Sequence, residues 1–198
     1  MGKQISVLLI IFCLFLVGCN KKEDTKEKTD IEIFEQIQIF DCPKNTTYTE
    51  VSGEEFTTEY YCLDENSKKI GPFQKYSDET GSIITVGEFL KDKPFGKWAQ
   101  WDKNGNLLVI GMFNENSEAD GFAAMWEPDG TYAVMYFENG KIPDNIFIFN
   151  AKGKLDKIFI TNIETNITRS QLDKDFILKI EEETKEDLAK ILDGLPKP

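Results

Sequence analysis

The sequence of 198 residues contains no histidine and is poor in basic side chains, with 23 Lys and Arg against 35 Asp and Glu. Without imidazole there can be no Ser-His-Asp triad, no Cys-His dyad and no histidine-ligated zinc site. The formal net charge of −12 argues against nucleic-acid binding, because neutralising phosphates needs a surplus of cations. Forty per cent of the residues are hydrophobic, which is enough for a folded core, and the length indicates one domain with appendages.

Motifs for cofactors and metals are also missing. There is no phosphate-binding loop and no dinucleotide fingerprint. Residues 102–106, DKNGN, resemble the start of a calcium loop, but Gly105 comes two positions early and Phe113 stands where a bidentate Glu is needed. We therefore predict a hairpin turn there, with no metal, no cofactor and no catalytic residue.

The N-terminus has the pattern of an export signal. Lys3 precedes an apolar stretch of about 13 residues, shorter than the roughly 20 that a membrane-spanning helix needs. The stretch ends in Leu16-Val17-Gly18-Cys19, which resembles the lipobox of bacterial lipoprotein signal peptides. The resemblance implies that residues 1–18 are removed and that Cys19 carries acyl chains such as palmitate. The alternative is a plain signal peptide with an incidental cysteine.

Residues 20–30, NKKEDTKEKTD, contain eight charges and no apolar side chain, which predicts a flexible tether. Removal of residues 1–18 takes away Lys3 and no acid, so 22 bases and 35 acids remain and the net charge becomes −13. We interpret this charge as a contribution to solubility. The expected location is the bacterial cell envelope, with a lipid anchor in the inner or outer membrane and the body on the periplasmic or surface side.

The four cysteines divide by position. Cys13 lies within the signal and Cys19 is the predicted lipid site, which leaves Cys42 and Cys62. Exported proteins fold under oxidising conditions, so a disulfide between these two is the default expectation. The alternative, two free thiols in a redox site, lacks the usual C-x-x-C spacing.

Three consecutive segments, 71–95, 96–120 and 121–143, repeat one pattern. Each has a first glycine, an aromatic residue five positions later and a glycine in a polar turn: Gly71, Gly96 and Gly121; Tyr76, Trp101 and Trp126; Gly81, Gly105 and Gly130. Asn-Gly and Asp-Gly in the turns predict β-hairpins. Residues 146–160 predict a fourth, degenerate unit, and residues 58–63 a half-repeat. The expected fold is mainly β, with repeated antiparallel hairpins in an extended sheet and a C-terminal α-helix.

The full pattern is G-x-W-x-x-W/Y, a polar turn, an apolar strand with G-x-F, and a polar N-G-K. It resembles the variant MORN repeat, which also occurs in proteins catalogued as YwqK-type antitoxin components. The second repeat matches well, whereas Phe73, Ala123 and Tyr136 depart from the pattern in the other two. Cys42-Pro43 and Tyr61-Cys62 resemble the disulfide-bearing cap of exported members. The resemblance implies a fold more firmly than an activity.

Aromatic side chains at equivalent repeat positions predict that their rings line up across neighbouring strands. Such a row of aromatic rings has two possible roles. They could form a buried core, in which Gly87 and Gly111 leave room for an aromatic side chain of an adjacent strand. They could instead form an exposed platform for glycan or peptide, made by Trp98, Trp101, Trp126 and Tyr76.

The C-terminal segment changes to a helical period. Ser170-Gln171-Leu172-Asp173 predicts an N-cap, and Gly194 and Pro196 predict the end of a helix of roughly 23 residues. One stripe of this helix is apolar: Leu172, Phe176, Ile177, Ile180, Leu188, Ile191 and Leu192. It would shield an end or face of the sheet or bind a partner, and we favour packing on the sheet.

The sequence thus divides into a signal peptide, a lipidated cysteine with its tether, a disulfide-bearing cap, repeats and a helical segment: 1–18, 19–30, 31–70, 71–160 and 161–198. We expect a membrane-anchored, non-enzymatic protein whose repeats bind another protein or act as a scaffold. One alternative is an envelope enzyme acting on glycans, which needs two carboxyl groups about 5–10 Å apart. Another is an immunity-like neutralising protein, which only the family resemblance suggests.

Overall fold

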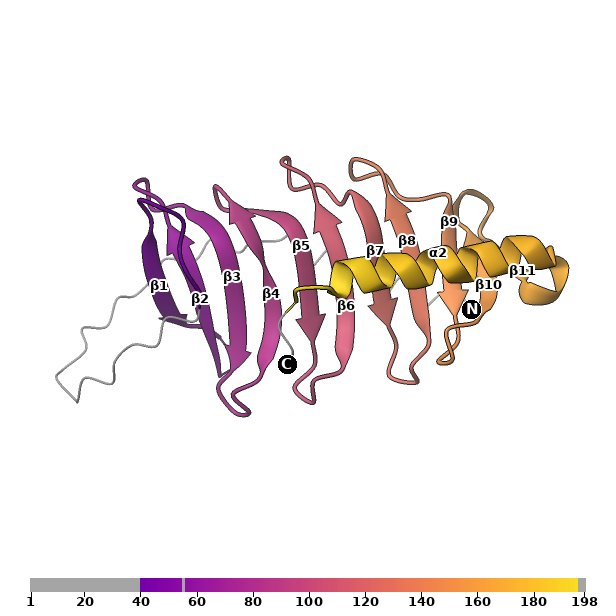
Figure 1. Cartoon of the computed structure of the whole chain (residues 1–198), viewed down its shortest axis with the longest axis horizontal. Coiled ribbons are helices and arrows are strands. Elements are labelled where there is room, and N and C mark those ends of the chain that lie inside the picture. Colours follow the sequence, from indigo (N-terminus) through magenta and orange to yellow (C-terminus); the bar gives the residue numbers. More distant parts are fainter. Residues whose placement is uncertain (1–39, 55, 196–198) are drawn as a thin grey trace. The chain divides into compact units, whose positions relative to one another are not determined.

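The computed structural model describes residues 40–54 and 56–195, all within one compact unit, Gln38–Pro198. The predicted signal peptide, Cys19 and the tether lie outside the described residues. The described chain forms one open antiparallel sheet of 11 strands followed by a C-terminal helix, as the sequence predicts (Figure 1). Within these ranges no helix has the length and apolar character needed to cross a bilayer.

The strands follow one another across the sheet in chain order. Every pair of neighbours is therefore joined directly, as expected for stacked hairpins. The strands are β1 Thr47–Ser52, β2 Thr57–Leu63, β3 Lys69–Ser77, β4 Ile83–Leu90, β5 Lys93–Trp101, β6 Leu107–Phe113, β7 Gly121–Trp126, β8 Tyr132–Phe137, β9 Asn145–Phe149, β10 Leu155–Ile160 and β11 Thr165–Thr168. Two short 3-10 helices, η1 Thr161–Ile163 and η2 Arg169–Gln171, flank β11 and precede helix α2, Lys174–Leu192.

The segment that resembles a calcium loop is a hairpin turn between β5 and β6. Asp102 Oδ1 accepts the backbone N–H groups of Asn104 and Asn106, each at 2.8 Å, and Gly105 has the positive φ of 82° that the turn requires. Hydrogen bonds from Asn106 lower the pKa of Asp102, and the bond from the Asn106 side chain has a larger effect than the bond from its backbone N–H. The carboxylate oxygens are thus engaged by the turn itself.

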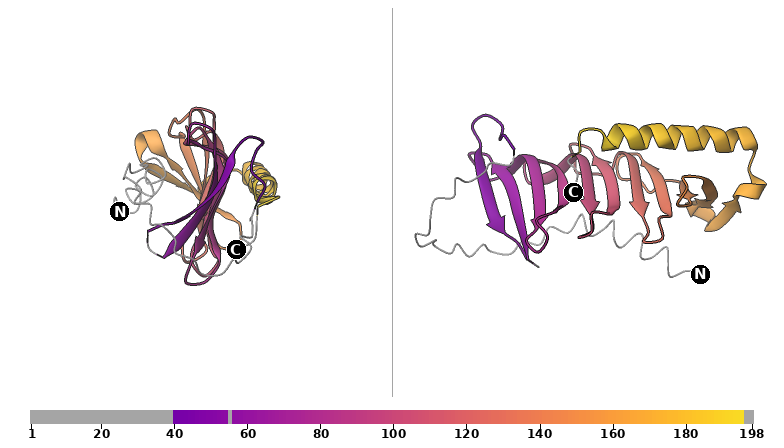
Figure 2. Two further views of the ribbon diagram at one scale, coloured as in Figure 1. Left: turned by 90° about the vertical axis from the view of Figure 1, so that its left-hand side faces the viewer. Right: turned by 60° about the horizontal axis from the view of Figure 1, so that its bottom comes forward.

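One row of register partners crosses the whole sheet and defines its two faces. Directly opposed residues of antiparallel strands lie on the same face. The row runs Glu50, Tyr60, Gln74, Val86, Ala99, Ile110, Ala124, Val134, Phe147, Ile158 and Ile167. From Val86 to Ile158 it is apolar. We call this side the helix face, because α2 packs on it and buries Ile177 and Ile191 in the same core cluster (Figures 1 and 2).

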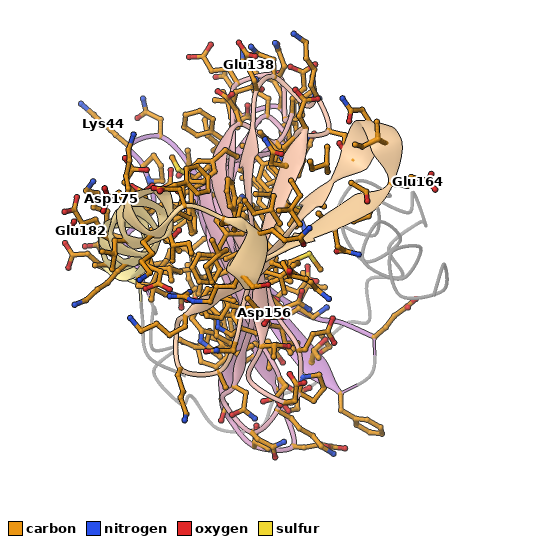
Figure 3. The ribbon with its side chains drawn as sticks, turned by 90° about the vertical axis from the view of Figure 1, so that its right-hand side faces the viewer. Lys44, Glu138, Asp156, Glu164, Asp175 and Glu182 are labelled. Carbon is orange, nitrogen blue, oxygen red and sulfur yellow. A yellow bond between two sulfur atoms is a disulfide. The ribbon has the colours of Figure 1, made fainter. Side chains whose placement is uncertain are left out.

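Helix α2 is shorter than the sequence pattern predicts, with 19 residues. It begins at Lys174 because Asp173 is the N-cap and accepts the N–H groups of Asp175 and Phe176. The residues expected as the cap instead belong to η2, which Thr168 caps. The predicted apolar stripe packs on the sheet except at Phe176 and Leu192, each 39% exposed. Acidic residues such as Asp175 and Glu182 project from the side of α2 that faces away from the sheet (Figure 3).

A carboxylate between α2 and β10 holds the helix near its middle. Glu181 Oε1 accepts hydrogen bonds from Arg169 at 2.6 Å and from the backbone N–H of Leu155 at 3.0 Å, and Lys154 reaches Oε2 at 2.9 Å. Burial by itself would raise the pKa of Glu181, but these three donors outweigh it and lower the pKa. The site therefore fixes the position of α2 along the sheet.

Two further polar contacts fix the C-terminal half of α2. The hydroxyl of Tyr136 donates to Asp187 Oδ2 at 2.9 Å. Lys97 Nζ donates to the carbonyl oxygens of Lys190 and Asp193, at 3.1 and 3.4 Å, so a cation on β5 meets the negative end of the helix. The last turn of the helix is therefore tied to β5.

The opposite face of the sheet contains the predicted glycine–aromatic packing, in one of the two expected places. A Cβ built on Gly87 would lie 2.3 Å from the indole of Trp98, which also stacks on Phe73 at 5.5 Å. A Cβ on Gly111 would meet only Ala123, at 3.6 Å. The expectation is thus confirmed for Gly87 and wrong for Gly111, because the third repeat has an alanine where an aromatic residue would fill the space.

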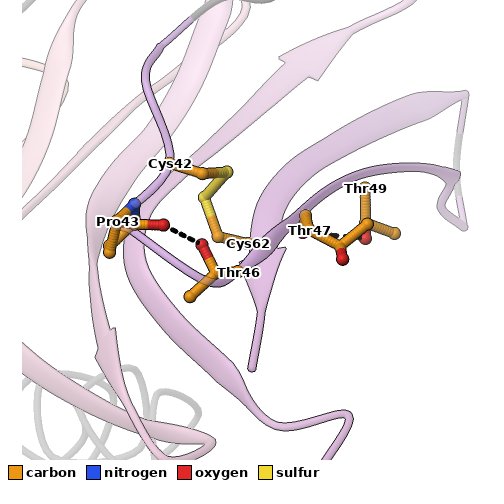
Figure 4. Close-up of a disulfide and its surroundings, with 6 residues drawn as sticks. All are labelled: Cys42, Pro43, Thr46, Thr47, Thr49 and Cys62. Carbon is orange, nitrogen blue, oxygen red and sulfur yellow. Dashed lines mark hydrogen bonds between the residues drawn. A yellow bond between two sulfur atoms is a disulfide. The ribbon is translucent and has the colours of Figure 1, made fainter. Parts of the chain in front are cut away.

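The predicted disulfide is present in the cap (Figure 4). Cys42 bonds to Cys62 of β2, with their Cα atoms 5.8 Å apart. The ring of Pro43 lies against Gly71 at the start of β3, where a Cβ would approach it to 2.8 Å. The segment before β1 is therefore joined covalently to β2, and its Pro43 packs closely on β3.

Candidate functional site

The four aromatic residues predicted as a binding platform do not form one exposed surface. Trp98 lies on the face opposite α2 and is only 6% exposed, and Trp101 is 7% exposed within the core of the helix face. Trp126 is half-buried and stacks on Tyr132, with ring centroids 5.5 Å apart. Each Trp is needed to fill space between strands or beneath α2, which is why a tryptophan platform is not available. Tyr76, half-buried, is the member that lies outside the cover of the helix.

A different aromatic surface lies on the part of the helix face that α2 leaves uncovered, over β1 to β4 (Figure 1). There the row across the sheet holds Glu50, Tyr60 and Gln74 in place of aliphatic residues. Tyr48 and Tyr76 flank Tyr60, with ring centroids 6.2 and 5.5 Å from it. We call these five residues the tyrosine face; its three tyrosines are all half-buried.

The tyrosine face combines neutral phenols with negative charge. Burial raises the pKa of Tyr60, and the nearby carboxylate of Glu50, with a smaller effect from Asp78, raises it further. Burial likewise raises the pKa of Tyr76, whose hydroxyl donates to Gln74 Oε1 at 3.1 Å. The hydroxyl groups of Tyr60 and Tyr76 therefore remain protonated at neutral pH, beside the carboxylates of Glu50 and Asp78.

A groove of about 500 Å³ begins where α2 ends. Gln74, Val86 and Glu88 line it from the sheet, and Asp193, Gly194 and Leu195 line it from the end of the helix. Gln74 belongs to both the groove and the tyrosine face, so the two form one continuous surface. This surface is the candidate functional site.

This surface presents aromatic rings, hydrogen-bond donors and carboxylates. In the described part of the chain, the carboxyl groups with a shifted pKa are Asp102, Asp129 and Glu181, and all three are lowered. The described residues contain no group of three or more His, Cys, Asp or Glu side chains placed to hold a metal ion.

Sequence reasoning found Tyr76 but missed Tyr48, Tyr60 and Glu50. In a β-strand, residues two positions apart lie on the same face. Applied to the cap, this rule places Tyr48 and Glu50 on one face of one strand, and Thr58 and Tyr60 on one face of the next. It would not have shown that this face is accessible, because that depends on where α2 stops. The sequence marks the end of the helix at Gly194, but only the contact of Lys97 with Asp193, far apart in the sequence, shows where along the sheet that end lies.

No protein-family model matches the sequence, and no curated protein matches it significantly. Among solved structures, the chain is similar to a crystal structure of TarM, with 15% identity and a TM-score of 0.36 over 63% of this chain. A mutant of S. aureus TarM, in complex with Fondaparinux, alpha-GlcNAc-glycerol and UDP, gives 14% identity and a TM-score of 0.23. The chain covers about a fifth of these proteins, 21% of each. Similarity at this level supports no argument about function.

Proposed function

We propose that this protein is a lipid-anchored lipoprotein of the bacterial envelope whose MORN-like repeat sheet binds a protein partner without catalysing a reaction. The observation that carries the proposal is the change along the row that crosses the helix face. The row is apolar beneath α2 and becomes Gln74, Tyr60 and Glu50 beyond its end. Tyrosine has an apolar ring and a polar hydroxyl, so it can be exposed to solvent and is also enriched at protein interfaces. This segment of the row therefore suits a surface that is solvated in the free protein and buried when a partner binds.

The charges at the site indicate what the partner carries. Glu50 and Asp78 lie close enough to Tyr60 to raise its pKa, and Glu88 lines the adjoining groove. A partner segment with Lys or Arg side chains would complement these carboxylates and could also lie against the tyrosine rings. We therefore propose a basic segment of another envelope protein as the occupant.

Replacing Gln74 with Arg is expected to weaken partner binding about tenfold, or 1.4 kcal/mol, because it places a cation between the tyrosine face and the groove. Gln74→Glu is the matched control: it has the same size, keeps an acceptor for the Tyr76 hydroxyl and should leave binding unchanged or stronger. The measurement is photo-crosslinking in intact envelopes, with a photoreactive phenylalanine analogue in place of Tyr60. The yield of the adduct is compared between the two Gln74 variants.

The same photoreactive residue in place of Phe176 is the control for position, because Phe176 is exposed on α2 away from the site. The proposal requires an adduct at position 60 that is absent at position 176. Equal adducts at both positions, or equal yields in the Arg and Glu variants, would show that the tyrosine face is not the binding surface.

Mass spectrometry of the mature N-terminus tests the proposed anchor. We expect the mature protein to begin at an acylated Cys19 and to occur in the membrane fraction. Cys19→Ala should keep residues 1–18 and lose the acyl mass. Wild-type protein with an unmodified Cys19 and residues 1–18 still attached would refute lipidation.

A further inference from the structure

Phe56, the residue immediately before β2, is the most exposed large apolar side chain in the described chain. It is 75% exposed, more than Ile163 at 65% or Ile142 at 60%. A single exposed apolar residue is ordinary on a protein surface. Phe56, however, also has a φ of 56°, in the left-handed region that is unfavourable for a bulky residue other than glycine.

The combination of a positive φ with an apolar side chain is confined to Phe56 among the described residues. The other non-glycine residues with a positive φ are polar or charged: Asn45, Ser67, Lys91, Asp92, Ser117, Asn139 and Glu164. Glycine and asparagine adopt this conformation at the lowest cost. The chain thus has a large ring at a position that a smaller or more polar residue would suit better. Residues strained in this way cluster at sites that contact ligands.

Hydrogen bonds on both sides of Phe56 hold its backbone in place. The carbonyl oxygen of Phe56 accepts the N–H of Asp78 at 2.8 Å. The buried Thr57 donates its hydroxyl to the carbonyl oxygen of Glu54 at 2.7 Å, and the N–H of Gly53 donates to the carbonyl oxygen of Thr57 at 2.6 Å. The ring is therefore presented to solvent from a fixed backbone, which reduces the conformational entropy that is lost on binding.

Phe56 lies beside the tyrosine face. Thr58, two residues further along, is the register partner of Tyr76, and its hydroxyl donates to Asp78 Oδ1 at 2.7 Å. The same Asp78 donates its backbone N–H to Phe56. Phe56, Asp78 and Tyr76 are therefore neighbours at one end of the tyrosine face.

We propose that Phe56 is a hot-spot residue of the binding surface, with its ring inserted into an apolar pocket of the partner next to the basic segment on the tyrosine face. Aromatic residues that fill a pocket on the partner contribute a large share of the binding free energy at interfaces. The carboxylates of Glu54 and Asp78 near the ring would attract a basic pocket rim and would disfavour an anionic lipid surface. The inference rests on the proposed function and identifies the residue that makes it specific.

Variants at position 56 separate binding from folding. Phe56→Asn removes the ring and suits a positive φ, so the melting temperature should be unchanged or higher. Phe56→Leu keeps an apolar side chain and does not relieve the backbone. With the photoreactive residue at position 60 in intact envelopes, we expect the adduct yield to fall at least about tenfold for the Asn variant and less for the Leu variant. A purely structural role predicts the reverse order, because Asn is the better residue for this backbone.

Ser67→Asn is the matched control. Ser67 is exposed, has a φ of 60° and lies in the turn between β2 and β3. Because it lies outside the proposed surface, its replacement should leave the adduct yield at position 60 unchanged. A second probe, with the photoreactive phenylalanine analogue in place of Phe56 itself, should capture the same protein as the probe at position 60.

The outcomes distinguish this inference from the proposed function. An adduct at position 60 whose yield is equal or higher in Phe56→Asn overturns the role of Phe56 and leaves the proposed function intact. Absence of that adduct while Phe56 is in place overturns both. A probe at position 56 that labels only lipid also overturns the inference and makes Phe56 a membrane contact. A fall in yield for Ser67→Asn as large as for Phe56→Asn would contradict a specific role for the ring.

Discussion

Replacing Gly87 with alanine is expected to lower the free energy of unfolding by about 3 kcal/mol or more, at the upper end of the cost of overpacking a core. The added Cβ would lie 2.3 Å from the indole of Trp98. The indole cannot easily move, because it stacks on Phe73 and its Nε1–H donates to the carbonyl oxygens of Glu88 and Phe95. For a domain of this size, the melting temperature should fall by roughly 6–12 °C in a thermal unfolding experiment.

Gly111→Ala is the matched control in the next repeat. Its Cβ would meet Ala123 at 3.6 Å, an ordinary contact, so we expect a change in unfolding free energy within about 1 kcal/mol. If the clash is the cause, Gly87→Ala should cost less when Trp98 is also truncated to alanine. Equal losses for the two glycine variants would show that backbone flexibility, rather than the indole, requires glycine at these positions.

Loss of the Cys42–Cys62 disulfide is expected to lower the free energy of unfolding by about 3 kcal/mol in the chain-entropy model. The bond closes a loop with a sequence separation of 20 residues. The two strands in that loop, β1 and β2, contribute few large aliphatic side chains to the core cluster, so little packing replaces the lost constraint. Urea unfolding with and without reductant gives the difference.

The double variant Cys42→Ala/Cys62→Ala distinguishes the effect of losing the disulfide from any other effect of the reductant on stability. It should show the lower stability in both conditions, with no further effect of reductant. Hydrogen exchange should also become faster in β1 before the strands beneath α2 are affected. A reduced protein within about 1 kcal/mol of the oxidised one would mean that cap packing, such as Pro43 on Gly71, holds β1 in place without the bond.

The sequence predicted the sheet because its signals are local. A positive-φ glycine in each polar turn, such as Gly105 and Gly130, and apolar strands between the turns define hairpins without reference to distant residues. The disulfide was predictable for a similar reason, from the two cysteines that remain outside the predicted signal and lipid site of a chain predicted to be exported. The start of α2 was predicted too early: Ser170 and Asp173 are both good caps, but in the structure Ser170 lies in η2 and Asp173 caps α2.

The candidate site was harder to predict. Repeat positions gave Tyr76, Trp101 and Trp126 equal standing, yet Trp101 is buried within the core cluster, whereas Tyr76 and Trp126 are half-buried and pack against it. Whether α2 covers a position depends on where the helix lies along the sheet, to which the contact of Lys97 with its C-terminus contributes. Such a contact, between residues 93 positions apart, leaves no periodic signal. Tyr48 lies outside the predicted repeats and Tyr60 lies in the short half-repeat, residues 58–63, so neither matches the aromatic position of the full repeats.

The disulfide also determines how mechanical load enters the sheet. The described chain begins at Phe40, and Cys42 is bonded to Cys62 in β2, so the whole of β1 lies inside the closed loop. Tension applied from the N-terminal side passes through the sulfur–sulfur bond directly into β2. Strand β1 is therefore outside the load path and is not the first strand to be peeled from the sheet. A chain pulled by a membrane anchor would thus keep its outermost strand, and the tyrosines beside it, in place.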